Sequence, residues 1–106
     1  MIEKRVEIWR NDEAELPTYD ARYYEKGILT RVFSVGTVNL NDRYFIGFSM
    51  FGTGVALGFI GKVRNLKEAD EICYQKALEE GQKIARKKGA GMLEDNTTRG
   101  FGFKKA

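Results

Sequence analysis

The chain has 106 residues, 42% of them hydrophobic, and a net charge of +3, which is typical of one globular domain. It has no histidine and one cysteine, which excludes a histidine-dependent catalytic triad, an intramolecular disulfide and a zinc finger. One cysteine suits a reducing compartment, and no apolar run approaches the roughly 20 residues that span a bilayer, so we expect a cytoplasmic protein without a membrane partner. Because histidine is the commonest catalytic base and metal ligand, its absence leads us to expect a non-enzymatic protein without metal or cofactor.

The first part of the chain predicts two strands. Residues 4–10 alternate, with Val6 and Ile8 facing one way, as in a half-buried strand. Residues 11–17 are acidic and break the pattern, which indicates a loop. Residues 19–24 alternate more weakly and predict the second strand.

The middle of the chain predicts a meander. Residues 28–40 are rich in β-branched and aromatic side chains, and Gly36 in their centre predicts a bend or bulge. Residues 43–51 and 55–63 predict two further strands, and the segments between the strands are short enough for tight turns. These turns fall at Asn41-Asp42 and Gly52-Thr53-Gly54.

Residues 66–88 predict one long helix. Asn65 is a good N-cap and Gly89 a natural stop. Apolar residues recur at helical spacing, and acidic and basic side chains lie at the ends where they complement the macrodipole. At 1.5 Å per residue the helix is about 34 Å long, which is enough to cross a sheet.

These elements predict an α+β fold, an antiparallel sheet of four or five strands with the long helix packed across one face. We assign residues 1–89 to a single α+β domain and residues 90–106 to a glycine-rich, basic C-terminal tail. An unpaired edge strand or the tail would let the chain pair with a second copy as a homodimer.

The basic residues concentrate at the end of the helix and in the tail. Residues 1–82 carry a net charge of −2, and residues 83–106 carry +5. Basic residues interleaved with aromatics suit nucleic acid, because cations contact phosphates and rings stack on bases. The predicted nucleic-acid-binding residues are Lys83, Arg86, Lys87, Lys88, Arg99, Phe101, Phe103, Lys104 and Lys105.

Two patterns resemble nucleic-acid-binding families. Arg99–Phe103 reads Arg-Gly-Phe-Gly-Phe and resembles the main ribonucleoprotein motif of the RNA-recognition motif family, whose aromatics stack on bases. Residues 36–84 resemble the sheet-plus-helix DNA-binding domain of plant ethylene-response factors and phage integrases, which implies a three-stranded sheet that contacts DNA. The matching residues are Leu57-Gly58-Phe59 at the end of the third strand and Glu68-Ala69, Tyr74 and Ala77 in the helix.

Two functions follow from the sequence. The first is non-enzymatic binding of DNA or RNA through the basic helix end and the tail. The alternative is a protein-binding effector or inhibitor, for example a phage-encoded protein acting on a host defence enzyme. A core of this size cannot hold every aromatic of the strands, and exposed aromatics favour protein interfaces. Those aromatics are Tyr23, Tyr24, Tyr44, Phe45, Phe48 and Phe51.

Overall fold

The computed structural model describes residues 3–51, 55–97 and 102–104, and it describes side chains at 3–51 and 57–97. The predicted turn at 52–54 lies outside the described residues. The strands are β1 Lys4–Arg10, β2 Thr18–Glu25, β3 Ile28–Leu40, β4 Arg43–Phe51, β5 Val55–Val63, β6 Met92–Asp95 and β7 Gly102–Lys104. The helix is α1 Leu66–Lys88.

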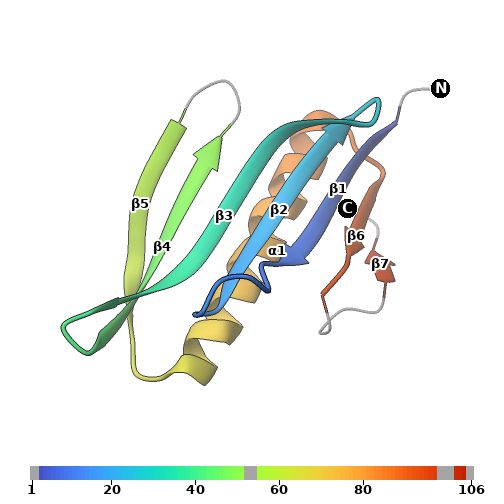
Figure 1. The fold of residues 1–106 in the computed structure, drawn as a ribbon. Coiled ribbons are helices and arrows are strands. Elements are labelled where there is room, and N and C mark those ends of the chain that lie inside the picture. The colour runs from blue at the N-terminus through green and yellow to red at the C-terminus, as the bar shows by residue number, and fades with distance from the viewer. Residues whose placement is uncertain (1–2, 52–54, 98–101, 105–106) are drawn as a thin grey trace.

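The described strands form one sheet in the order β5-β4-β3-β2-β1-β6-β7, with α1 across one face (Figure 1). Strands β1 to β5 are an antiparallel meander, as the sequence predicts. The expected four or five strands are too few, because β6 pairs parallel with β1 and β7 pairs antiparallel with β6. The α+β class, the meander and the long helix on one face are confirmed.

The pairing of the strands is irregular at two places, and neither of them involves Gly36. The register shifts between Tyr23 and Tyr24 and again between Ile46 and Gly47. Gly36 pairs regularly with Thr18 and Gly47, so the bulge expected there is wrong. A Cβ at Gly36 would lie 2.8 Å from Thr18 Oγ1, so this glycine makes room for its neighbour's side chain.

The helix begins and ends where its caps predict. The Asn65 side chain accepts a hydrogen bond from the Glu68 amide, and Gly89 closes the helix with a positive φ of 72°. The buried side of α1 carries small residues that allow close approach to the sheet. A Cβ at Gly81 would lie 2.8 Å from Ile8 Cδ1, so the helix rests directly on β1.

The core lies between α1 and the strands it covers. The largest fully buried side chains are Tyr19, Tyr23 and Phe33, and Ile8 and Leu93 pack with them. Truncating a buried aromatic of this kind to alanine costs about 3–5 kcal/mol. Leu93 belongs to the segment that the sequence assigns to the tail, so this part of the tail contributes to the core and, through β6, to the sheet.

Hydrogen bonds between polar side chains join the helix to the sheet. The Tyr19 hydroxyl and the Arg10 guanidinium both donate to Asp70 Oδ1, at 2.8 and 2.6 Å. Further along α1, the Tyr74 hydroxyl donates to Asp95 Oδ2 at 2.5 Å. Hydrogen bonds to charged groups contribute more than neutral ones, so these contacts fix the helix against β1, β2 and β6.

Candidate binding surface

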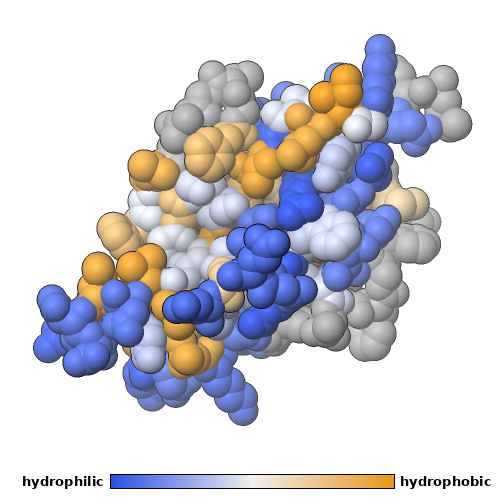
Figure 2. Space-filling view, viewed as in Figure 1, coloured by the Kyte–Doolittle hydropathy of each residue, from blue (hydrophilic) through white to orange (hydrophobic). Residues whose placement is uncertain are grey.

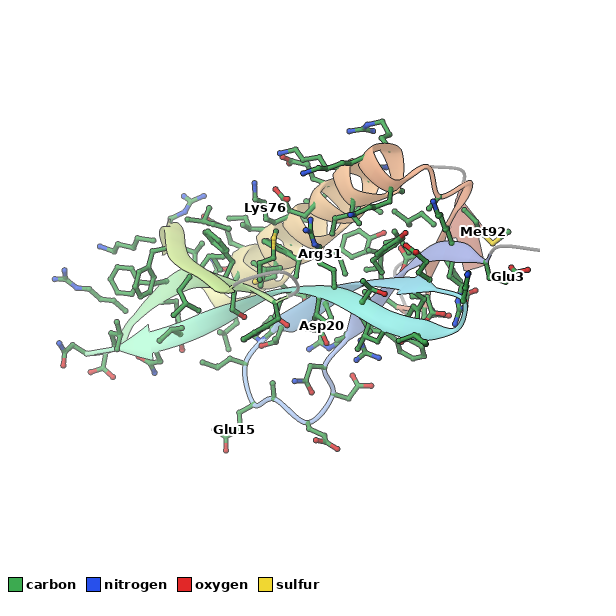
Figure 3. The ribbon with its side chains drawn as sticks, turned by 90° about the horizontal axis from the view of Figure 1, so that it is seen from above. Glu3, Glu15, Asp20, Arg31, Lys76 and Met92 are labelled. Carbon is green, nitrogen blue, oxygen red and sulfur yellow. The ribbon has the colours of Figure 1, made fainter. Side chains whose placement is uncertain are left out.

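The sheet has a second face, opposite α1, which no other described helix or strand covers (Figure 1), although the loop of residues 11–17 projects on this side, where Figure 3 labels Glu15. Side chains on a strand alternate between the two faces, so the residues between the core positions belong to this open face. In Figure 3, Asp20 lies on the open side of the sheet and Arg31 on the side of α1. The open face divides into two halves of opposite character.

The first half, here called the polar half, consists of charged and aromatic side chains on β1 and β2. Arg5 Nε donates to Glu7 Oε2 at 2.6 Å, and Arg22 Nη2 donates to Asp20 Oδ2 at 3.2 Å. Each arginine also lies over a ring, with Arg5 4.4 Å from the centre of Tyr24 and Arg22 5.2 Å from that of Trp9. The members of the polar half are Arg5, Glu7, Trp9, Asp20, Arg22 and Tyr24.

Glu7 is the centre of the polar half. It is only 8% exposed, and it accepts hydrogen bonds from Arg5 and from Trp9 Nε1, the latter at 2.8 Å. Burial raises the pKa of Glu7, but the hydrogen bonds from Arg5 and Trp9 and the positive charges of Arg5 and Arg22 outweigh it. The pKa therefore lies below its ordinary value, and the carboxylate stays charged.

The second half, here called the apolar half, covers β3, β4 and β5. Leu57 is 75% exposed, Phe59 68% and Phe51 48%. Figure 2 shows hydrophobic side chains gathered over these strands and hydrophilic ones over β1 and β2. The members of the apolar half are Val32, Val38, Leu40, Phe45, Phe51, Leu57 and Phe59.

A shallow groove of about 490 Å³ lies within the apolar half. Val38, Leu57 and Phe59 are among its lining residues, and the paired Gly36 and Gly47 contribute no side chain to fill it. The Phe59 ring lies against Gly47, where a Cβ would be 3.7 Å from the ring. The apolar half is therefore hollowed at its centre and raised around it.

Two cations lie at one end of the apolar half. The register pairs Arg43 with Leu40 and Lys62 with Phe45, which places both cations on the open face. Among the described residues, no ion pair includes either side chain, although both are exposed. The arginines of the polar half, by contrast, are both paired with carboxylates.

The predicted nucleic-acid site is only partly within the described side chains. Lys83 forms ion pairs with Glu80 at 3.3 Å and Glu79 at 3.5 Å. Its hydrogen bond to Glu80 and the neighbouring carboxylates raise its pKa. Arg86 and Lys87 are exposed on α1, and Lys88 is half-buried. Part of the predicted positive charge is thus balanced within the helix.

The end of α1 lies beside other charged groups. Lys4 Nζ donates to the Lys88 carbonyl at 3.3 Å. A hydrogen bond from the Tyr23 hydroxyl, together with the charges of Lys4, Lys88 and Lys26, lowers the pKa of Glu25. The helix end, the start of β1 and the β2–β3 turn therefore form a mixed, mainly basic cluster.

The remaining predicted residues are in the tail. Arg99, Phe101 and Lys105 lie outside the described residues. Phe103 and Lys104 belong to β7, where Phe103 pairs with Glu94 and Lys104 with Leu93, and their side chains are not described. A continuous surface of helix end and tail therefore stays a prediction.

The aromatics predicted to be surplus to the core are distributed in three ways. Tyr23 is fully buried, Tyr44 and Phe48 are partly buried against the core, and Phe51 is exposed. The sequence-based list omitted Leu57 and Phe59, the most exposed members of the apolar half. Their signal was present, because the apolar residues of β5 fall on both faces of the strand instead of alternating with polar ones.

Comparisons with known proteins gave no match to a family model, a curated protein or a solved structure.

Within the described side chains, no three of the residue types His, Cys, Asp and Glu lie together in a way that could hold a metal ion. Among the described residues, no helix is long and apolar enough to cross a membrane. Cys73 is buried, and burial raises the pKa of its thiol to about 11, which makes it a poor nucleophile.

Proposed function

We propose that this protein is a protein-binding module whose recognition surface is the apolar half of the open face. The observation that carries this proposal is the exposure of Leu57 and Phe59 on β5 and of Phe51 on the neighbouring strand β4, all on the open face. Contiguous exposed apolar patches larger than roughly a few hundred Å² are rare on monomeric proteins and mark interaction sites. Effector or inhibitor activity on another protein is consistent with such a surface.

The composition of the surface supports a protein partner. Aromatic and aliphatic side chains occupy its centre, and charged side chains occur at its rim, as in protein interfaces. The groove beside Phe59 offers a place for an anchoring side chain, and buried anchors dominate interface energetics. Leu57 and Phe59 contribute little to the core because they are mostly exposed.

The proposal is tested by partner capture with the full chain and the double variant Leu57→Thr/Phe59→Thr. Threonine keeps the β-propensity of the strand and removes the apolar surface. We expect a specific partner that binds the wild type and is lost with the double variant. Met92→Thr is the matched control, since Met92 is also an exposed apolar strand residue but lies on β6. A partner retained by the double variant would contradict the proposal.

A second candidate function is nucleic-acid binding through the helix end. It is supported by the exposure of Arg86 and Lys87 next to the cluster that contains Lys4 and Lys26. If about six cations of the helix end and tail contact phosphates, affinity for a single-stranded oligonucleotide falls with salt at a log–log slope of about −4 to −5. A flat salt response, or unchanged affinity of Arg86→Glu/Lys87→Glu, would contradict this function.

A further inference from the structure

We infer that the partner presents an acidic amphipathic helix, which packs on the apolar half with carboxylates against Arg43 and Lys62. This inference rests on the proposed function and names the chemistry of the partner. It is based on the charge of the apolar half and on the layers of the fold.

The apolar half has positive charges without counter-charges. On the open face of β3, β4 and β5 the ionisable side chains are Arg43 and Lys62, and neither has an ion pair among the described residues. Between residues 28 and 63 the only carboxylate is Asp42, in the β3–β4 turn. A partner that covers Phe45 also covers these neighbouring cations, so carboxylates at that end of its surface would match them.

Two copies of the chain stacked apolar half on apolar half would fit poorly. Stacking two apolar halves would bring four cations together and would supply no carboxylate from the open face of β3, β4 or β5. In the polar half, Glu7 and Asp20 are already engaged with Arg5 and Arg22. Like charges at an interface oppose association, so charge complementarity favours a different, acidic partner.

The layers of the fold favour a helix as the covering element. A sheet with apolar side chains on both faces can bury the second face against another layer, and a helix is one of the two elements that form such layers. Helix α1 supplies such a layer on one side, chiefly over β1, β2 and β3 (Figure 1). A helix presents protruding side chains at three- and four-residue spacing, one of which would enter the groove beside Val38, Leu57 and Phe59. A lipid surface has no equivalent protrusion.

The test uses the full chain and two synthetic amphipathic helical peptides with a neutral fluorophore. Both peptides carry the same leucine stripe, and they differ only in having glutamate or lysine beside it. At low ionic strength we expect the glutamate peptide to bind at least about tenfold more tightly than the lysine peptide, with the difference shrinking as salt increases. Anisotropy titrations measure both affinities.

Charge-reversal variants of the protein show which residues cause the preference for the glutamate peptide. Arg43→Glu/Lys62→Glu should reverse the preference, so that the lysine peptide binds more tightly than the glutamate peptide. Arg86→Glu/Lys87→Glu changes the net charge equally at the exposed helix end and should leave the preference unchanged. Circular dichroism and unfolding curves confirm that both variants are folded.

Other outcomes overturn the inference in distinguishable ways. Equal affinity for the two peptides, lost in Leu57→Thr/Phe59→Thr, would refute the acidic partner and leave the proposed surface standing. A preference abolished only by Arg86→Glu/Lys87→Glu would move the contact to the helix end. No peptide binding, or binding only to phosphatidylglycerol vesicles, would exclude an acidic helix, and partner capture then decides the proposed function separately.

Discussion

On the open face, each arginine of the polar half forms an ion pair with a carboxylate and contacts an aromatic ring, whereas Arg43 and Lys62, at the end of the apolar half, form no ion pair within the described residues. The two halves belong to one sheet, but the charged side chains of the polar half have partners within the chain and those beside the apolar half do not. The polar half completes its own interactions and needs no partner. The apolar half leaves both hydrophobic area and charge unmatched, which is typical of a surface that another molecule covers.

This difference separates stability from recognition. Substitutions in the polar half should cost folding free energy, because they break contacts that exist in the isolated chain. Substitutions in the apolar half should cost little folding free energy and should instead affect binding. The predictions below test this separation, from the largest expected effect on stability to the smallest.

The largest loss is expected for Glu7→Ala. The change removes the buried carboxylate that accepts hydrogen bonds from the partly exposed Arg5 guanidinium and Trp9 indole N–H. Losing the charged acceptor should cost about 2–3 kcal/mol of unfolding free energy, measured by urea denaturation. Glu15→Ala is the control, since Glu15 is exposed in a loop, and it should stay within about 0.5 kcal/mol of the wild type. Equal small losses in both variants would show that the network does not stabilise the fold.

The lowered pKa of Glu7 should also make the unfolding free energy depend on pH in the acid range. Its pKa in the folded protein lies below the ordinary value of 4.5 that it has in the unfolded chain, so the unfolded state binds its proton first. The stability that it contributes is fully present above about pH 4.5 and is lost as the pH falls through the lower, folded pKa. Denaturation of wild type and Glu7→Gln across this range should give a shallower pH dependence for the variant. Parallel curves would contradict the assigned role.

A smaller loss is expected for Arg22→Ala, which removes an ion pair to Asp20 and a contact with the Trp9 ring. The site is partly exposed and screened by solvent, so the cost should be about 1 kcal/mol of unfolding free energy. The control is Arg64→Ala, because Arg64 is highly exposed and makes only an i,i+4 pair with Glu68. Its effect should be at most about 0.5 kcal/mol. The same loss at both positions would indicate that the ring contact adds nothing.

The smallest effect is expected for Arg43→Ala and Lys62→Ala. Both side chains are exposed, and no ion pair of the described residues includes them. Each variant should unfold within about 0.5 kcal/mol of the wild type in urea. A loss comparable to that of Arg22→Ala would mean that these cations stabilise the fold and are not reserved for a partner.

The sequence was a good guide where local chemistry decides the structure. Asn65 and Gly89 cap the helix at the predicted ends, and Asn41-Asp42 separates β3 from β4 as expected. The parallel pairing of β6 with β1 was not predicted, because it joins segments more than 80 residues apart and a four-residue strand has almost no local signal.

The candidate surface was harder to predict than the fold. The basic helix end stands out in the sequence, but the Lys83 charge is paired with Glu79 and Glu80 along the helix. Strand β5 is apolar on both faces between Val55 and Ile60, and a short apolar run does not reveal which of its residues the helix covers. The structure shows that α1 lies on the other face of the sheet, which leaves Leu57 and Phe59 exposed.

The central claim is that the apolar half serves recognition and contributes little to folding. Its most direct test is the unfolding free energy of Leu57→Thr/Phe59→Thr. Since these side chains are 75% and 68% exposed, the double variant should lie within about 1 kcal/mol of the wild type. A loss of about 3 kcal/mol or more, comparable to that of Glu7→Ala, would contradict the claim and make the apolar half part of the core.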